Sequence, residues 1–350
     1  MRKLPVFILL FAFALYGQDA APKAPEAAAK PQEAVAKPAE APKPAEAAKP
    51  AEAPKPAEAA KPAEAPKPPE AAPKKEEPPK GPHFDTPVPK DPDSFRICSF
   101  NIRTRGDKAP NDWQTRISRI LAIFEKYDLD SIGVQELTTQ QKNALMAKAT
   151  NYAAVGVGRE PNKQGEHNCV IYRKDRFDCL DAGTFWLSTT PDVVGSHSWK
   201  TACRRICTWA KLKDKKTGKE FVHFNTHLDH RSEDARRNGA ALIMSRMDDI
   251  AKGLPCFLTG DMNCRIATPS IQSFLAKMKN TKDVSETPHE GTFQTFHAYR
   301  YTDGKVTNGE IDFIFFNGDM RVLSHATIND HNGNEFPSDH FPVMAEIILK

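Results

Sequence analysis

The sequence feature that most constrains the fold is an apolar run that ends in a carboxylate and a carboxamide, Leu258–Asn263. Phe257 and Leu258 follow a Gly and a Pro, and a short apolar run after such residues is typical of a buried strand. Residues two positions apart in a strand face the same side. Asp261 and Asn263 could therefore act together at the strand end, Asp261 on a proton or a metal-bound water and Asn263 on a phosphoryl oxygen. A simple turn is the alternative, because Gly, Asp and Asn favour turns.

The first residues of the chain have the features of a secretory signal peptide. Arg2 and Lys3 precede an apolar run, Leu4–Tyr16, which is too short to span a bilayer and is followed by small residues. We predict cleavage after Gly17 and export to the periplasm, the cell surface or the medium, with no membrane span in the mature chain. An uncleaved N-terminal anchor is the alternative.

Residues 18–91 consist largely of Pro, Ala, Lys and Glu, and the unit Lys-Pro-Ala-Glu-Ala followed by Pro or Ala recurs over residues 37–65. A segment of this composition cannot bury enough apolar surface to offset its ordering entropy, and its prolines favour extended backbone. We predict a disordered, semi-stiff spacer that holds the following domain away from a membrane or contacts the cell wall or envelope. A low-complexity insertion without function is the alternative.

Residues 92–350 are long enough for one large domain with a full core. The whole chain carries a net charge of +4. The signal start and the spacer leave about +3 on the domain, a balance that neither favours nor excludes a nucleic-acid partner. We expect a monomer.

All seven cysteines lie in this domain, in an odd number and without a regular framework. Cys98 and Cys256 belong to apolar runs, where a buried free thiol is the expected state. Cys203 and Cys207 are the first pair to test for a disulfide. A zinc site built from this pair is not expected, because no second pair has metal-ligand spacing.

Strands and helices alternate in the first part of the domain and strands dominate around residues 152–228, which predicts a mixed α/β class with a large sheet content. Helices are expected after Asn111, after a capping box formed by Thr138 and Gln141, from Ser232 to about Ile250, and near residues 271–278. The predicted strands are residues 95–102, 131–137, 152–157, 169–172, 184–187, 206–212, 221–228, 311–316 and 341–349.

Polar residues recur inside or at the ends of these apolar strands. A buried charge is costly unless it is paired or binds a metal, so such positions indicate a shared site, although each one alone could be structural. The positions are Asn101, Glu136, His227, Asp261, Asn263, Asp312, Asp339 and His340.

Six short motifs in these regions resemble, in order, those of the endonuclease/exonuclease/phosphatase superfamily, and the match covers residues 94–350. They are Ser-Phe-Asn-Ile at 99, Gly-Val-Gln-Glu-Leu at 133, Asn-Thr-His-Leu-Asp at 225, Leu-Thr-Gly-Asp-Met-Asn at 258, Glu-Ile-Asp-Phe-Ile at 310 and Ser-Asp-His-Phe-Pro-Val at 338. The resemblance implies a four-layer α-β-β-α sandwich, two packed mixed β-sheets with flanking helices, and a phosphoesterase site where strand ends converge.

The resemblance also implies roles for the polar residues in a metal-dependent hydrolysis of phosphodiesters or phosphomonoesters. Mg²⁺ or Mn²⁺ would be bound by Asn101 and Glu136, with Asp339 nearby. Asp261 would orient or deprotonate the attacking water, and Asn263 would hold a phosphoryl oxygen. Charge in the transition state would be stabilised by His227 and by His340, whose tautomer Asp312 fixes. An oxygen-rich ligand set suits a hard cation, and a His paired with a buried Asp is a good proton donor.

Two further residues are candidate substrate ligands. Arg205, directly before a predicted strand, could reach the phosphate, or could be a surface group. His167 stands in a region where many relatives carry a tyrosine near the phosphate. At the position where pancreatic-type deoxyribonucleases carry a glutamate that partners the first histidine, this chain has Ile206, so the resemblance leaves the partner of His227 open.

Two other interpretations are open at this point. Residues 225–230 are similar to the His-x-His-x-Asp-His signature of di-zinc metallo-β-lactamase-fold hydrolases, but Asn225 replaces the first histidine. The domain could also be an inactive surface module on the spacer, because fold does not establish function. Within the enzyme interpretation the substrate is not fixed, and DNA, RNA, phospholipid, inositol phosphates and sugar phosphates are all candidates. A basic aromatic groove for nucleic acid could involve Trp186, Trp199, Arg204, Arg205, Arg236 and Arg237.

Overall fold

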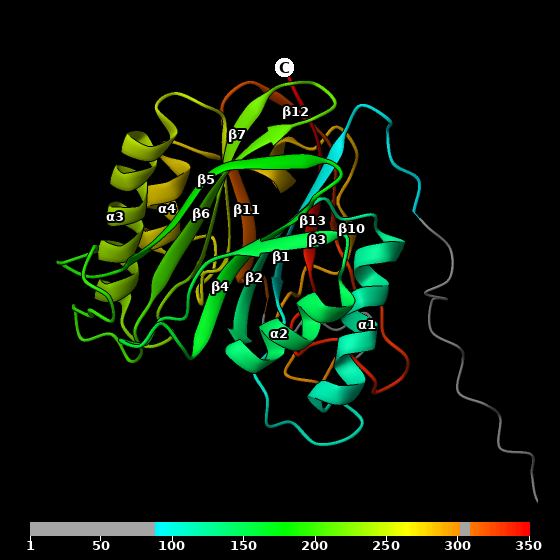
Figure 1. Ribbon diagram of the computed structural model, residues 1–350, viewed down its shortest axis with the longest axis horizontal. Coiled ribbons are helices and arrows are strands. Elements are labelled where there is room, and N and C mark those ends of the chain that lie inside the picture. Colours follow the sequence, from blue (N-terminus) through cyan, green and yellow to red (C-terminus); the bar gives the residue numbers. More distant parts are fainter. Residues whose placement is uncertain (1–87, 302–308) are drawn as a thin grey trace, which may run out of the picture. The chain divides into compact units, whose positions relative to one another are not determined.

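The computed structural model describes residues 88–301 and 309–350, which Figure 1 shows as ribbons. The predicted signal peptide and the predicted spacer up to residue 87 lie outside the described residues. The last residues assigned to the spacer, Val88–Asp91, contact the domain. The Val88 amide donates to the Lys126 carbonyl at 2.8 Å, and Lys90 Nζ lies 2.8 Å from Asp130 Oδ2. The contacts of the domain therefore begin at or before Val88, ahead of the predicted boundary at residue 92.

Two β-sheets form the centre of the domain. The first contains, in spatial order, β10 (Glu290–Gly291), β12 (Met320–Thr327), β13 (Val343–Leu349), β1 (Phe95–Asn101), β2 (Ser131–Thr138), β4 (Glu166–Arg173) and β3 (Tyr152–Val155). The second contains β5 (Phe177–Trp186), β6 (Ile206–Asp214), β7 (Glu220–His227), β8 (Cys256–Asp261), β11 (Asp312–Asn317) and β9 (Lys279–Asn280). Both sheets are mixed, because β1 runs parallel to β2 but antiparallel to β13, and β8 runs parallel to β7 but antiparallel to β11.

Helices cover the outer face of each sheet, so the four-layer α-β-β-α sandwich is confirmed (Figure 1). The helices are α1 (Trp113–Lys126), α2 (Thr139–Lys148), α3 (Glu233–Ala251), α4 (Pro269–Leu275) and the short 3₁₀ helix η1 (Thr281–Val284). Helices α1 and α2 pack on the first sheet, and α3 and α4 pack on the second. The capping box at Thr138 and Gln141 is confirmed, and Ser232 caps α3 by accepting from the Ala235 amide.

The side chains that face inward from each central strand form a row that changes from apolar to polar along the strand. Alternation puts every second residue between the sheets. In β7 this row runs from Phe221 through His223 and Asn225 to His227, and in β8 it runs from Phe257 to Asp261. The phenylalanines form an aromatic core, with the rings of Phe221 and Phe257 5.5 Å apart. Each row thus begins in apolar packing and ends in a polar residue at one edge of the sandwich.

A hydrogen-bonded polar network fills the middle of these rows. His223 Nδ1 lies 2.8 Å from Ser131 Oγ and His223 Nε2 lies 2.8 Å from Thr259 Oγ1. Asn225 Nδ2 donates to the carbonyls of Val134 and Cys169 at 2.9 Å, and Asn225 Oδ1 accepts from Gln135 Nε2 and Thr259 Oγ1. The sheets approach so closely here that a Cβ on Gly133 would lie 1.9 Å from Thr259 Oγ1, so only glycine fits at that position.

Two of the longer strands differ from the sequence prediction, and the two-residue strands β9 and β10 were not predicted. Strand β12 was not predicted, because Arg321 and Ser324 interrupt its apolar pattern and a bulge between Val322 and Ser324 shifts its alternation. Strand β5 begins at Phe177 rather than near residue 184, since it is the edge strand of its sheet and its first half is exposed and polar. An edge strand does not need the apolar alternation on which the prediction relied.

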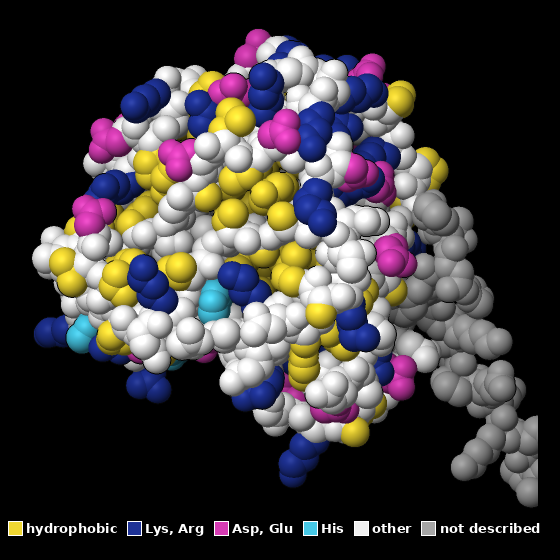
Figure 2. Space-filling view, viewed as in Figure 1, with side chains coloured by type: hydrophobic (Ala, Val, Ile, Leu, Met, Phe, Trp, Pro, Cys, Tyr) yellow, Lys and Arg dark blue, Asp and Glu magenta, His cyan; other side chains and the backbone are white. Residues whose placement is uncertain are grey.

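The suggested disulfide between Cys203 and Cys207 is wrong for this structure, in which both residues are free cysteines. Cys207 is buried in β6 against the core beneath α3, whereas Cys203 lies in the preceding loop at the wall of a pocket. Among the helices of residues 88–301 and 309–350, none has the combined length and hydrophobicity that a membrane crossing requires. On the face in Figure 2, Lys and Arg are interspersed with Asp and Glu in the upper part of the view.

Candidate active site

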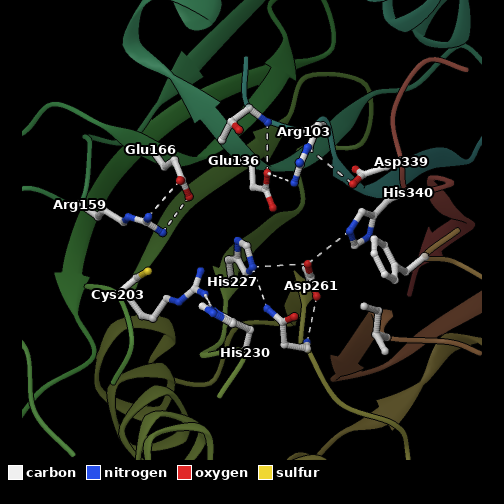
Figure 3. A pocket seen from close by; sticks show the side chains of 15 residues that line it. Arg103, Glu136, Arg159, Glu166, Cys203, His227, His230, Asp261, Asp339 and His340 are labelled. Atoms are coloured by element: carbon white, nitrogen blue, oxygen red, sulfur yellow. Dashed lines mark hydrogen bonds and ion pairs between the residues drawn. The ribbon is translucent and has the colours of Figure 1, made fainter. Parts of the chain in front are cut away.

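The ends of the inward rows converge on one pocket of about 360 Å³. His227 at the end of β7 pairs in register with Asp261 at the end of β8, and Asp312 at the start of the antiparallel β11 also pairs with Asp261. The pocket is lined by Arg103, Thr104, Glu136, Arg159, Glu166, Cys203, Arg205, His227, His230, Asp261, Asn263, Phe296, Ile311, Asp339 and His340. Figure 3 shows Glu136, His227, Asp261 and His340 directed toward a common space.

Irregular backbone geometry sets the direction of two of these side chains, Glu136 and Asn263. A register shift between β2 and β4 lies between Val134 and Leu137, and within it Glu136 has a φ of 61°. A bulge re-aims a side chain, and here it directs Glu136 to the pocket while Gln135 stays in the network between the sheets. Asn263 has a φ of 49°, and its amide donates to Asp261 Oδ1 at 2.9 Å. The turn expected as an alternative thus coexists with the predicted site.

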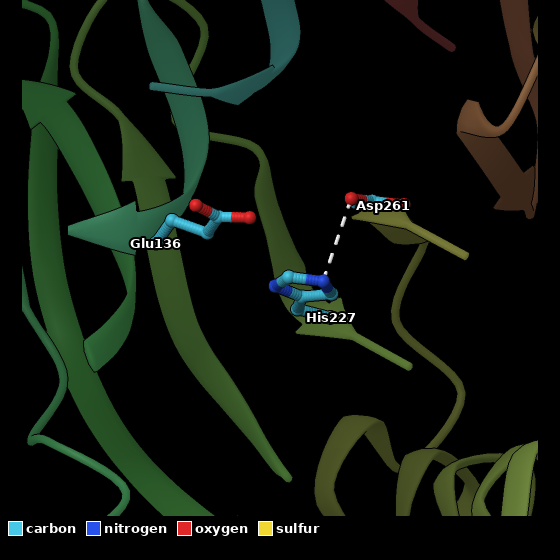
Figure 4. Close-up of side chains that lie close together, drawn as sticks. All are labelled: Glu136, His227 and Asp261. Carbon is cyan, nitrogen blue, oxygen red and sulfur yellow. Dashed lines mark ion pairs between the residues drawn. The ribbon is translucent and has the colours of Figure 1, made fainter. Parts of the chain in front are cut away.

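Carboxylates and a carboxamide meet at one wall of the pocket. Asn101 Nδ2 lies 3.1 Å from Glu136 Oε1 and 3.0 Å from Asp261 Oδ2. Glu136, His227 and Asp261 offer potential metal-ligand atoms within 4.8 Å of one another (Figure 4). Asp339 lines the same pocket and is bridged to Glu136 by Arg103, whose guanidinium lies 3.6 Å from Asp339 and 3.9 Å from Glu136. This oxygen-rich wall fits a hard divalent cation.

The His340 side chain is held as a cation. Its Nδ1 donates to Asp312 Oδ2 at 2.9 Å, and its Nε2 lies 3.8 Å from Asp261 Oδ2. Burial by itself would lower the pKa of His340, but the carboxylates of Asp312 and Asp261 outweigh it and raise this pKa to about 10. Asp261, Asp312 and His340 also lie within 4.8 Å of one another. With its Nδ1 donating to Asp312 and its Nε2 near Asp261, His340 is suited to pass a proton.

His227 is held neutral on the opposite side of Asp261. Its Nε2 lies 2.8 Å from Asn263 Nδ2, which positions it to accept a hydrogen bond, and 3.4 Å from Asp261 Oδ2. Burial, and then the charges of Arg205 and Arg159, lower the pKa of His227. Ile206 is a buried apolar residue, so Asn263 stands as the partner of His227 that the sequence left open.

The pKa of Asp261 is raised to about 7 by burial and then by the neighbouring Asp312. Glu136 differs: burial acts against its ionisation, but the charge of His340 and the hydrogen bond from Asn101 lower its pKa overall. Asp261 is therefore suited to accept a proton near neutral pH, and Glu136 is suited to remain charged beside a cation.

Arg205 lines the pocket as predicted, whereas His167 does not. His167 is buried in β4, and its Nδ1 lies 3.1 Å from the carbonyls of Leu137 and Gly165. Its sequence neighbour Glu166 faces the pocket instead, because successive side chains of a strand point to opposite faces.

The sequence analysis also missed several pocket residues: Arg103, Thr104, Arg159, Glu166, Cys203, His230, Phe296 and Ile311. Most lie in loops without periodicity. Arg103 and His230 could have been found, because each directly follows a predicted site motif.

A two-sheet sandwich that gathers carboxylates, a carboxamide and two unlike histidines at one edge is the arrangement of a phosphoester hydrolase. The model of the endonuclease/exonuclease/phosphatase family matches residues 98–340, and the chain belongs to this family. No match is found among curated proteins.

Solved structures agree with this assignment. An endonuclease/exonuclease/phosphatase protein from Bacteroides vulgatus shares 35% sequence identity over 73% of this chain and 99% of its own, with a TM-score of 0.69. A Bacteroides thetaiotaomicron mannosyl-6-phosphatase shares 30% identity over 73% of this chain and 100% of its own, with a TM-score of 0.68. D. rerio TDP2 in complex with a single-stranded DNA product has a TM-score of 0.58 at 16% identity over 73% and 98%, which shows the fold alone.

The family assignment removes the support for the di-zinc interpretation. Asn225, the first residue of the supposed signature, is fully buried between the sheets, where its amide donates to two backbone carbonyls. It does not line the pocket and is not available as a metal ligand there.

Proposed function

We propose that the protein is an exported, divalent-metal-dependent phosphoesterase that hydrolyses its substrate by in-line attack of a water activated by Asp261. The observation that carries the proposal is the opposed protonation of groups around Asp261. His340 beside it is held protonated, His227 is held neutral, and the pKa of Asp261 itself lies near 7. An acid and a base with separated pKa values in one pocket are what ester hydrolysis requires.

Glu136, Asn101 and Asp339 would hold the cation, for which Mg²⁺ and Mn²⁺ are the candidates. When bound, the cation would neutralise negative charge on the phosphoryl oxygens. The Arg103 guanidinium lies between Glu136 and Asp339, which shows that these carboxylates favour a positive charge at this position.

The residues of the chain supply the remaining steps. Asp261 accepts a proton as the water oxygen bonds to phosphorus. Asn263 Nδ2 donates to His227 Nε2 at 2.8 Å and to the Leu228 carbonyl at 3.0 Å. It would exchange one of these bonds for a phosphoryl oxygen when substrate binds, with His227 beside it in the pocket wall. The phosphorus–oxygen bond to the leaving group breaks, and His340 gives its proton to the departing oxygen, which leaves as an alcohol. Asp312 holds the resulting neutral imidazole in place through its hydrogen bond to Nδ1.

Export and the spacer rest on residues 1–91 of the sequence. In this proposal the domain acts outside the cytoplasm as a monomer, with the spacer contacting the cell wall or envelope. The relative named a mannosyl-6-phosphatase supports sugar phosphates as candidate substrates, and nucleic acids stay among the candidates that the sequence left open.

The test is hydrolysis of bis(4-nitrophenyl) phosphate and 4-nitrophenyl phosphate by the purified mature chain with Mg²⁺ or Mn²⁺. We expect release of 4-nitrophenol that chelator abolishes, and loss of at least about a thousandfold in Asp261→Ala. Full activity in Asp261→Ala would overturn the assignment. No activity with either ester, or with DNA, RNA, phospholipid, inositol phosphates and sugar phosphates, would favour an inactive binding module.

A further inference from the structure

The buried guanidinium of Arg205 lies in the pocket wall, and within the described part of the chain no carboxylate accepts a hydrogen bond from it. The Arg205 side chain is only 5% exposed, and its Nε and Nη1 atoms make no hydrogen bond. Its Nη2 lies 3.1 Å from His230 Nδ1, a neutral acceptor. Burial, followed by the nearby charge of Arg159, lowers the pKa of Arg205.

The nearest acidic group does not neutralise Arg205. Asp229 Oδ2 lies 3.8 Å from Arg205 Nε, beyond hydrogen-bonding distance. That oxygen already accepts from Thr201 Oγ1 at 2.7 Å and from the Ala202 amide at 2.9 Å. The other carboxylate oxygen accepts from the amides of residues 231 and 232. Asp229 therefore organises the adjoining loop.

The other arginine of this wall is paired. Arg159 Nη1 lies 2.7 Å from Glu166 Oε2, and Arg159 Nη2 lies 2.9 Å from Glu166 Oε1. This bidentate pair carries no net charge. Figure 3 shows it, with Cys203 and His230, on the side of the pocket away from Asp339 and His340. Unlike Arg159, Arg205 therefore has no carboxylate that accepts two hydrogen bonds from its guanidinium.

The backbone at Arg205 is held by the end of β5, since the Leu187 amide donates to the Arg205 carbonyl at 2.8 Å. Trp186 Nε1 donates to the Arg159 carbonyl at 2.7 Å, which ties the neighbouring loop to the same strand. An unpaired buried charge is costly, and a rigid protein keeps one at a site where a ligand supplies the opposite charge. The missing partner of Arg205 is therefore an anion in the pocket.

We propose that the substrate is a phosphomonoester and that Arg205 is the residue that recognises its terminal phosphate. This inference rests on the proposed function. At neutral pH a monoester phosphate carries close to two negative charges and three non-bridging oxygens, whereas a diester carries one charge and two such oxygens. The acidic wall, once it holds a cation, and the groups around Asp261 would take up two oxygens. The guanidinium of Arg205, which lines the pocket and donates to no carboxylate, then suits the third oxygen and the second charge.

The kinetic test compares two esters with the same leaving group, 4-nitrophenyl phosphate and bis(4-nitrophenyl) phosphate. We expect the mature wild-type chain to prefer the monoester in kcat/KM. Arg205→Gln should lower kcat/KM for the monoester about ten- to a hundredfold, mainly through KM, and change the diester rate by less than about threefold. Arg205→Lys should recover part of the loss. The matched control is Arg204→Gln, whose side chain does not line the pocket, and it should change neither rate by more than about threefold.

A binding test does not depend on turnover. Inorganic phosphate should raise the melting temperature of the wild-type protein and of Arg204→Gln, but not that of Arg205→Gln. Without phosphate, Arg205→Gln should melt at the wild-type temperature or above it, because the substitution removes an unpaired buried charge. A lower melting temperature without phosphate would show that Arg205 has a structural role and would overturn the inference.

The outcomes separate the inference from the proposed function. Preference for the diester, or an equal loss of both rates in Arg205→Gln, overturns the monoester inference and leaves the phosphoesterase standing. A requirement for a second phosphate on the substrate, as in a bisphosphate, also overturns it, because Arg205 would then recognise the additional group. If neither these esters nor the natural phosphate esters named above are hydrolysed, the proposed function fails, and loss of phosphate stabilisation in Arg205→Gln still supports an anion site at this residue.

Discussion

Similar polar residues lie in the middle of the sandwich, between the sheets, and at its edge, around the pocket. They differ in how completely their hydrogen bonds are satisfied. In the middle, the side chains of Ser131, His223, Asn225 and Thr259 bond to one another or to the backbone. The one unpaired atom of that network is Gln135 Oε1. In and directly beside the pocket, several buried atoms are without hydrogen-bond partners, namely Arg103 Nε, Arg159 Nε, Arg205 Nε and Nη1, and Asp312 Oδ1. Satisfied polar groups hold the sheets together, whereas the unsatisfied ones collect around the pocket.

The largest expected effect comes from changing the edge. Asp312→Asn removes the carboxylate that holds His340 protonated, so we expect kcat to fall about a hundred- to a thousandfold. In the wild type the pKa of His340 is about 10, so its acid form persists through neutral pH. Without the Asp312 charge, burial lowers this pKa, and the alkaline limb of the kcat profile should move to lower pH. A profile measured from pH 5 to 10 that keeps its alkaline limb would contradict this role of Asp312.

Changing the middle should affect stability and leave chemistry intact. Asn225→Leu removes two donors from buried carbonyls and an acceptor from Gln135 and Thr259, which we expect to cost about 3 kcal/mol. Urea unfolding measures this loss, and activity per folded molecule should stay within about twofold. The matched control is Asn238→Leu on the exposed face of α3, expected within about 0.5 kcal/mol. A stable but inactive Asn225→Leu protein would show that Asn225 acts in catalysis and would contradict its assignment as a structural residue.

The network also predicts a pH dependence of stability. Burial lowers the pKa of His223 to about 3, against about 6.5 in an unfolded chain. Between these values the unfolded state binds a proton that the folded state does not, so the free energy of unfolding falls as pH falls from about 6.5 to 3.

His223→Gln should remove this contribution, so that the loss of stability between pH 7 and pH 5 is smaller than in the wild type by about 2 kcal/mol. His197→Gln, a change at an exposed histidine, should leave the loss unchanged. An unchanged loss in His223→Gln would show that the buried histidine does not govern acid sensitivity. Urea unfolding at the two pH values decides the matter.

The smallest expected effect concerns the acidic wall. Arg103 lies 3.6 Å from Asp339 and 3.9 Å from Glu136, so its charge opposes a cation that uses the same carboxylates. Arg103→Gln should bind Mn²⁺ more tightly by up to about fivefold, roughly 1 kcal/mol for one partly exposed charge. Calorimetric titration with Mn²⁺ measures the change, and Arg105→Gln at an exposed neighbour is the control. Weaker binding would show that Arg103 helps to build the metal site.

The difference between middle and edge also explains how far the sequence could be interpreted. Asn101, Glu136, Asp261 and His340 were identified because they belong to ordered motifs at the ends of apolar runs. Arg205 was identified only as an alternative, since nothing in its neighbours distinguishes a buried arginine from a surface one. His167 was placed on the wrong side of β4, because a one-residue shift in a strand exchanges its two faces.

The sequence by itself determined most of the strand and helix pattern, the family and the main candidate site residues, because these depend on local periodicity and on motifs with fixed spacing. Only the tertiary structure decided which polar residues pair with one another and which do not. His223 and His227 lie four residues apart on one strand, yet the first is enclosed by Ser131 and Thr259 and the second faces the pocket beside Asn263. Their environments come from strands distant in the chain, and those contacts exist only once the two sheets have packed.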